Sequence, residues 1–107
     1  MTEQATYILA SLAQGELHGY GIARDVEEMS DGRVRLTAGT LYGALNRLSA
    51  DGLVEPAGER RVQGRRRRYY RLTAAGRAEL STEVERLRSA AAALGARVAT
   101  LPTPGLA

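Results

Sequence analysis

Arginine side chains crowd one short stretch of the chain, and their chemistry suits the binding of phosphate. Residues 60–71 read RRVQGRRRRYYR and contain seven arginines and no acidic residue, so this segment alone carries a charge of +7. A planar guanidinium group donates two parallel hydrogen bonds and is weakly hydrated, which favours contacts to a phosphate backbone or a minor groove. A solvated charge run is the alternative. Because seven like charges repel one another, we favour a polyanionic partner, a nucleic acid, over that alternative.

Residue types that support catalysis or metal binding are scarce. The chain has no cysteine, which removes disulfides, thiolate metal sites and cysteine nucleophiles. Its one histidine, His18, lies in the segment ELHGYG, where we expect a turn or capping residue rather than a catalytic base. The serines lack a nucleophile elbow, and no glycine-rich phosphate loop is present. We therefore expect no enzymatic activity, no cofactor and no metal site.

The charge outside the arginine-rich segment is mildly acidic. The net charge of +3 comes from 15 basic and 12 acidic residues, and every basic residue is arginine. Eight arginines and all twelve acids lie outside residues 60–71, so the remaining chain carries −4. A length of 107 residues predicts one small domain. No apolar run approaches the length of a membrane span, and Glu3 stands where a signal peptide would be basic, so we expect a cytoplasmic protein.

Four helices are predicted to position these groups. Apolar spacing indicates helices over residues 3–14 and 20–30. A third helix is predicted from an N-cap at Thr37 to a C-cap at Gly52. Its apolar face consists of Leu41, Ala44, Leu45 and Leu48. A long fourth helix is predicted over residues 74–101.

A β-hairpin is predicted between the third and fourth helices. Residues 53–55 form its first strand, which is expected to end at Pro56, and residues 68–72 form its second strand. The intervening AGERRVQGRRR is predicted to be an exposed tip.

The order of these elements predicts a mainly α fold with a small β-hairpin, a winged helix-turn-helix followed by a long C-terminal helix. We expect a DNA-binding domain over residues 1–73, a dimerisation helix over residues 74–101 and a flexible tail over residues 102–107. In such a fold the third helix enters the major groove, and the hairpin, or wing, contacts a neighbouring groove or the phosphate backbone. Gly39 would allow close approach to phosphate, and Asn46 and Arg47 would reach base edges or phosphates.

A heptad pattern on the fourth helix predicts a homodimer. Its apolar positions are Leu80, Val84, Leu87, Ala91, Leu94, Val98 and Leu101. A helix of about 28 residues is roughly 42 Å long, more than a domain of this size can cover. We expect a second copy to cover it, with Ile8 and Leu12 of the first helix as additional contacts. The alternative is a helix that lies on its own domain's core.

Several motifs resemble the PadR family of bacterial transcriptional regulators, in its short form with one C-terminal helix. These motifs are LHGYGIA at residues 17–23, GTLY at residues 39–42, GLV at residues 52–54 and YYRLT at residues 69–73. They occur in the family's order, and the resemblance covers roughly residues 4–80. Two departures are that Ala38 and Gly43 stand where the family commonly has proline, and that tryptophan is absent.

The resemblance implies a homodimeric winged-helix repressor that binds double-stranded DNA. It implies helix-turn-helix contacts by Tyr20, Thr37, Gly39, Thr40, Tyr42, Asn46 and Arg47. It implies wing contacts by Gly64, Arg65, Arg66 and Arg67, with Tyr69 supporting the wing or touching phosphate. Family members often release DNA when a phenolic or other lipophilic effector binds, and Tyr7 with alanines 90–93 are candidates to line such a pocket. A winged-helix module that binds a protein or an RNA remains the alternative function.

Overall fold

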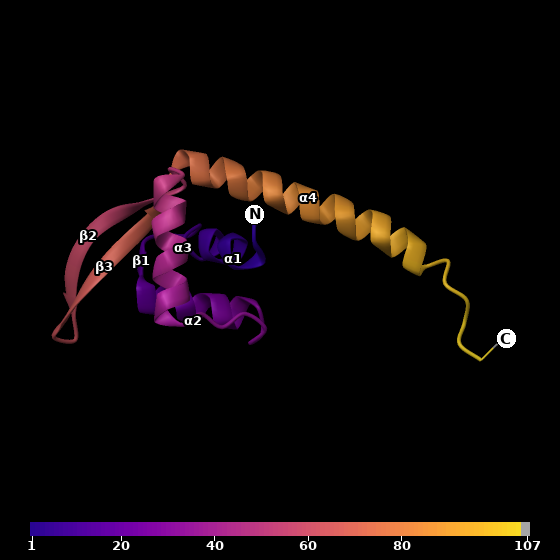
Figure 1. Ribbon diagram of the computed structural model, residues 1–107, viewed down its shortest axis with the longest axis horizontal. Coiled ribbons are helices and arrows are strands. Elements are labelled where there is room, and N and C mark those ends of the chain that lie inside the picture. Colours follow the sequence, from indigo (N-terminus) through magenta and orange to yellow (C-terminus); the bar gives the residue numbers. More distant parts are fainter. Residues whose placement is uncertain (106–107) are drawn as a thin grey trace.

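The computed structural model describes residues 1–105, and it has the winged helix-turn-helix arrangement that the sequence predicts (Figure 1). The helices are α1 (Glu3–Ser11), α2 (Gly19–Met29), α3 (Ala38–Ala50) and α4 (Ala74–Val98). The strands are β1 (Leu17–His18), β2 (Val54–Val62) and β3 (Arg65–Leu72), and they form one antiparallel sheet in the order β1-β3-β2.

Each helix begins at a side chain that accepts a hydrogen bond from a backbone N–H of its first turn. The N-caps are Thr2, His18, Thr37 and Thr73. The N–H of Gly21 donates to Nδ1 of His18 over 3.1 Å, which confirms the capping role predicted for this histidine. Such caps satisfy backbone donors that have no partner inside the helix. They fix the starts of α2 and α3.

The hydrophobic core joins α1, α2 and α3 to the base of the hairpin. Its members include Leu9, Ile22, Val26, Leu41, Leu45, Val54, Tyr70 and Leu72. Ile8 and Leu12 belong to the same core, where they are 0% and 2% exposed in the single chain. This corrects their assignment to a dimer interface, because side chains already buried in their own domain have no surface left for a partner.

The hairpin is longer than the sequence predicts. Its first strand passes through Pro56, at which a strand end is wrongly expected, because β2 is the edge strand and a bulge between Pro56 and Glu59 accommodates the ring. The turn is only Gln63 and Gly64, whose φ angles of 52° and 77° suit a two-residue hairpin turn. Most of the predicted tip therefore consists of paired strands.

The two-residue strand β1 is missing from the sequence prediction. Leu17 pairs with Tyr70, and His18 pairs with Tyr69, so the segment before α2 is hydrogen-bonded to the hairpin rather than forming a free turn. Two residues are too few to show the alternating pattern by which strands are recognised. The consequence is that the start of α2 is tied directly to the wing.

Helix α4 extends away from the rest of the molecule (Figure 1). The molecule measures 64 × 27 × 22 Å, and its radius of gyration is 17.5 Å, whereas a compact domain of this length has about 13 Å. Among residues 1–105, no helix combines the length and the apolar character needed to cross a membrane. The predicted tail over residues 102–107 contains no helix or strand up to residue 105, and its last two residues lie outside the described part.

Candidate nucleic-acid interface

The exposed face of α3 carries most of the candidate base-reading residues. Gly39 and Asn46 are exposed on the side opposite the buried residues Leu41 and Leu45, as the helical period requires. No other atom group lies within 4 Å of where a Cβ would stand on Gly39, so a ligand has open access to the helix here.

The N-terminal end of α3 is exposed and ordered by its threonines. Thr37 accepts a hydrogen bond from the N–H of Thr40 over 3.2 Å, and the two hydroxyl groups are 3.0 Å apart. Exposed N–H groups and the helix dipole make this end favourable for a phosphate.

An aromatic cluster joins the start of α2 to the wing. We define it as His18, Tyr20 and Tyr69, with Arg60 and Arg67 on the outer rings. The His18 ring stacks on Tyr20 at a centroid distance of 6.3 Å and meets Tyr69 edge-on at 5.4 Å. Arg60 lies over Tyr69 at 4.1 Å, and Arg67 lies over Tyr20 at 5.7 Å. Cation–π contacts of this kind hold both guanidinium groups against the surface.

Tyr42 of α3 lies against the start of α2 and so connects α3 to the aromatic cluster. A Cβ on Gly19 would stand 3.0 Å from the Cζ atom of Tyr42, so the tyrosine ring crosses the start of α2 in space that only glycine leaves open. Tyr42 remains 43% exposed and Tyr20 remains 61% exposed. Both phenol groups are therefore available to a ligand that approaches α3 and the wing together.

The wing places arginines directly opposite one another on its two strands. Its register pairs Arg60 with Arg67 and Arg61 with Arg66. Like charges at directly opposite positions of an antiparallel pair destabilise it. The sequence predicts the charge of this segment but not this pairing, which follows only once the turn is placed at Gln63 and Gly64.

Acidic side chains neutralise part of the wing. The ion pairs join Arg60 to Glu16, Arg66 to Glu59, and Arg71 to both Glu16 and Glu55. In the part of the chain that the structure describes, Arg61, Arg65, Arg67 and Arg68 have no carboxylate partner. The unneutralised positive charge is thus concentrated toward the tip of the wing.

Burial and the neighbouring Arg67 guanidinium lower the pKa of His18 below its ordinary value. The neutral ring that results can keep accepting the hydrogen bond that caps α2. The Nε atom of Arg67 is itself buried and has no hydrogen-bond partner within residues 1–105. The guanidinium therefore carries an unsatisfied donor while it lies over Tyr20.

The structure does not gather every predicted contact in one place. Arg47 is exposed on the edge of α3 opposite Tyr42, where it lines a surface hollow of about 360 Å³ with Asp51 and Glu79. Gly64 and Arg65 lie at the far end of the wing.

Two residues that are not among the individually predicted contacts belong to the same surface. Arg60 is brought to the cluster by its position opposite Arg67, and Glu16 is brought there by β1. Strand pairing counted outward from the Gln63–Gly64 turn is the signal that would have identified Arg60. No comparable signal identifies Glu16.

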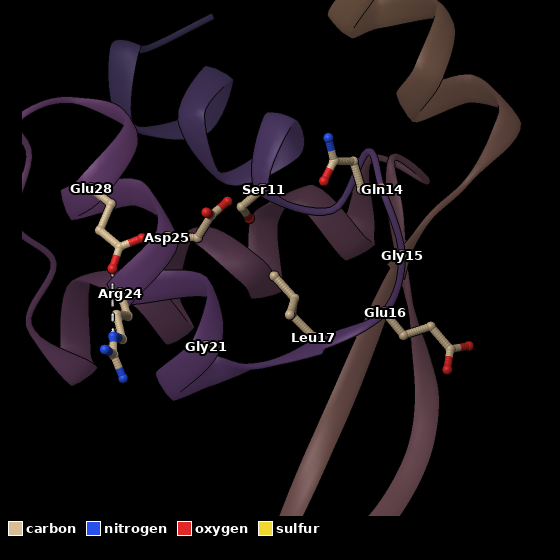
Figure 2. Close-up of a pocket in the computed structure, with 9 residues that line it drawn as sticks. All are labelled: Ser11, Gln14, Gly15, Glu16, Leu17, Gly21, Arg24, Asp25 and Glu28. Atoms are coloured by element: carbon tan, nitrogen blue, oxygen red, sulfur yellow. Dashed lines mark ion pairs between the residues drawn. The ribbon is translucent and has the colours of Figure 1, made fainter.

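A polar hollow of about 480 Å³ lies beside α2 (Figure 2). Its lining includes Ser11, Gln14, Arg24, Asp25 and Glu28. Within residues 1–105, no group of three or more histidine or acidic side chains is arranged to hold a metal ion. Figure 2 shows the Glu16 side chain pointing away from Arg24, Asp25 and Glu28.

The predicted dimer-interface residues on α4 differ in exposure along the helix. Leu80 and Val84 are half-buried near the core, whereas Leu87, Leu94 and Val98 are 47%, 67% and 62% exposed. Ala91 is exposed as well. The apolar stripe thus leaves its own domain after about the third turn.

Comparisons with known proteins place this chain in one family. Residues 8–82 match the family described as "Transcriptional regulator PadR-like family". Over 77 residues, the chain is 44% identical to the transcriptional regulator Rv3488 of Mycobacterium tuberculosis, covering 72% of this chain and 68% of that protein.

Solved structures show the same fold. A PadR family transcription regulator from Clostridium difficile superposes with a TM-score of 0.77 at 24% identity, covering 91% of this chain and 99% of that one. Bacillus subtilis PadR, solved in complex with operator DNA, gives a TM-score of 0.65 at 25% identity, covering 75% of this chain and 46% of that one. The family match runs from within α1 through α2, α3 and the wing to the start of α4, and the family's members are transcriptional regulators rather than enzymes. The chain therefore belongs to the PadR-like family of transcriptional regulators.

Proposed function

We propose that the chain acts as a dimeric transcriptional repressor, which binds a pseudo-palindromic operator through α3 and the arginine-rich wing. The observation that carries this proposal is the wing register, which sets Arg60 opposite Arg67 and Arg61 opposite Arg66. The ion pairs Arg60–Glu16 and Arg66–Glu59 neutralise one arginine of each pair, so they offset only part of the cost in stability of placing like charges opposite each other. A bound polyanion would remove the rest of that cost. Arg67, which has no carboxylate partner within residues 1–105, lies over Tyr20 at the start of α2.

The roles within the interface follow from side-chain chemistry. Asn46, exposed on α3, offers an amide that can pair with the edge of an adenine in a major groove. The guanidinium groups at the wing tip reach phosphates or a minor groove. The structure of Bacillus subtilis PadR with operator DNA supports this assignment, since that protein shares the fold over 75% of this chain.

Dimerisation would occur through α4. Its exposed Leu87, Leu94 and Val98 continue the apolar stripe that begins at the protein core. A groove of about 460 Å³ runs beside this stripe between α1 and α4, with Tyr7 and Met29 among its lining residues. A second copy of α4 matches the exposed stripe, because the heptad repeat is self-complementary and an isolated helix of this kind exposes its apolar face to water.

The same groove suits a small lipophilic effector. Its lining combines apolar side chains of Leu80, Val84 and Leu87 with the phenol of Tyr7, and its volume lies in the range of ligand pockets. Alanines 90–93, the other candidates, do not line it. An effector bound here would touch α1 and α4 at once, so it would change the angle between the DNA-binding domain and the dimerisation helix.

The DNA-contact assignment is tested by titrating a labelled duplex from the chain's own upstream region against salt. Six to eight phosphate contacts predict a slope of log K against log salt of about −5 to −7. Replacing Arg65, Arg66 and Arg67 together by alanine should weaken binding to all duplexes. It should also make the slope shallower by about 0.9 for each phosphate that the variant no longer neutralises.

The base-reading role proposed for Asn46 is tested by a separate variant. Asn46→Ala should change the preferred sequence while leaving the salt slope unaltered. Equal losses on every duplex would contradict the role given to Asn46. Competition by structured RNA that exceeds competition by duplex DNA, or no duplex binding at low salt, would instead favour the alternative of an RNA-binding or protein-binding module.

A further inference from the structure

One carboxylate links the segment before α2 to both strands of the wing. Glu16 lies just ahead of β1 and pairs through Oε1 with Arg60 of β2 and through Oε2, over 3.5 Å, with Arg71 of β3. Its side chain is about one-third exposed, and it points away from the acidic residues of the neighbouring hollow (Figure 2). Within residues 1–105, the carboxylate of Glu16 forms ion pairs only with the wing arginines Arg60 and Arg71.

The contact with Arg60 removes one wing guanidinium from the charge available to DNA. Arg60 is held from two sides, by the carboxylate of Glu16 and by the face of Tyr69 at 4.1 Å. Its cross-strand neighbour Arg67 carries a like charge and has no carboxylate partner within residues 1–105. Glu16 offsets this repulsion on one side of the pair only.

We propose that Glu16 is a specificity-determining residue, which withholds Arg60 from phosphate and holds the base of the wing in register with α2 and α3. The inference rests on the proposed DNA-binding function. A phosphate contact strengthens binding to every sequence alike, so a carboxylate that occupies Arg60 lowers affinity for random DNA. Fixing the wing base favours operator binding, because only there must the wing and α3 be aligned with the same base pairs.

The lowered pKa of Glu16 agrees with a strong ion pair between Glu16 and Arg60. The hydrogen bond from Arg60 lowers the pKa of Glu16 below its ordinary value against an opposing effect of burial. The carboxylate is therefore charged throughout the neutral range and remains so well into the acidic range.

The test compares Glu16→Gln with the control Glu28→Gln. Both variants add one positive charge, but Glu28 pairs with Arg24 on α2 and contacts no wing arginine. We expect Glu16→Gln to raise the affinity for a random duplex about threefold and to steepen its salt slope by about 0.9, the effect of one additional phosphate contact. Operator affinity should rise less or fall, so the ratio of operator to random affinity decreases. Glu28→Gln should leave slope and ratio unchanged.

Removing Arg60 from the Glu16→Gln background tests whether Arg60 carries the effect. The double variant Glu16→Gln with Arg60→Gln should lose the added affinity for random DNA and return the slope to its original value. An unchanged slope in Glu16→Gln, an effect matched by Glu28→Gln, or an equal loss on operator and random DNA together with a lower melting temperature would overturn the inference.

The outcome for the unaltered protein separates this inference from the function on which it rests. Failure of the unaltered protein to bind any duplex would overturn the proposed function. Duplex binding by the unaltered protein that Glu16→Gln leaves unchanged would overturn only the role of Glu16. The pair is also visible without DNA, since Glu16→Gln and not Glu28→Gln should shift the Arg60 guanidinium and Tyr69 ring resonances in NMR spectra.

Discussion

His18 combines three contacts that are usually made by separate residues. Its Nδ1 atom caps α2, its ring face stacks on Tyr20, and its ring meets Tyr69 on the wing. The sequence predicts the cap, because histidine stands between glycines ahead of a helical pattern. The ring contacts could not be predicted, since they depend on β1, a strand too short to leave a pattern, which brings Tyr69 beside His18.

The lowered pKa of His18 makes stability depend on pH in a defined window. In that window the unfolded chain binds more protons than the folded one, so folding stability rises with pH. The free energy of unfolding reaches its full value above the ordinary histidine pKa of about 6.5, where His18 is neutral in both states. It declines as the pH falls below that value, because the unfolded chain then takes up a proton more readily than the folded one. Because the chain has one histidine, no second histidine contributes to this decline.

His18→Asn tests this dependence, because asparagine retains an N-cap acceptor and does not titrate. Urea unfolding at pH 7.5 and pH 5.5 should show a smaller loss of unfolding free energy in the variant than in the unaltered protein. An identical loss in both proteins would show that His18 does not carry the effect.

Helix α4 is the element with two different environments along its length. Its first turn is packed tightly, because a Cβ on Gly76 would overlap the carbonyl oxygen of Leu53 and lie 2.7 Å from Leu72. Its far end stands clear, and nothing lies within 4 Å of a Cβ placed on Gly95. The sequence predicts this helix and its cap at Thr73, but it does not distinguish the two glycines, because contacts with the Gly52–Leu53 turn are set by the fold.

The same substitution should therefore have opposite effects at the two ends of α4. Gly95→Ala should stabilise the protein by up to about 1 kcal/mol, the helix propensity gained by replacing glycine. Gly76→Ala should destabilise it by about 1 to 3 kcal/mol, since the added methyl group must displace backbone atoms. Unfolding curves at one fixed protein concentration measure both, and a stabilising Gly76→Ala would contradict the tight packing of the first turn.

The wrongly expected strand end at Pro56 shows that local sequence does not fix the length of a strand. Pro56 is a reasonable strand terminator, but it is tolerated on the edge strand β2 beside a bulge. The positive charge of the wing was predictable from the arginine content of residues 60–71. The placement of its arginines on paired strands was not, because the edge position of β2 is a property of the whole sheet.

The whole molecule is an elongated body whose long helix exposes an apolar stripe. The apolar stripe of α4 was predictable from the heptad spacing, whereas the burial of Ile8 and Leu12 was not, because helical periodicity alone does not say which of two apolar surfaces a residue faces. In the single chain those residues complete the core. The surface available to the proposed second copy is accordingly the exposed half of α4.

Leu94→Glu tests this assembly without touching the core, because Leu94 is 67% exposed in the single chain. A charge buried in the dimer interface without a partner is strongly unfavourable, so the variant should sediment as a helical monomer at concentrations where the unaltered protein is a dimer. The matched control is Ser89→Glu, on the opposite side of α4, which should remain dimeric. A folded Leu94→Glu dimer would contradict the interface.

The central claim is that two copies of the chain read a specific DNA sequence together, and selection of bound fragments from a genomic library tests it most directly. The dimeric arrangement predicts enriched fragments that share a pseudo-palindrome, with half-sites separated by about one helical turn of 10 to 10.5 base pairs or a multiple of it. The proposed arginine and Asn46 contacts predict that this enrichment is lost for the Arg65, Arg66 and Arg67 triple variant and changes in sequence for Asn46→Ala. Recovery of fragments with no shared sequence, or of none above background, would contradict the claim.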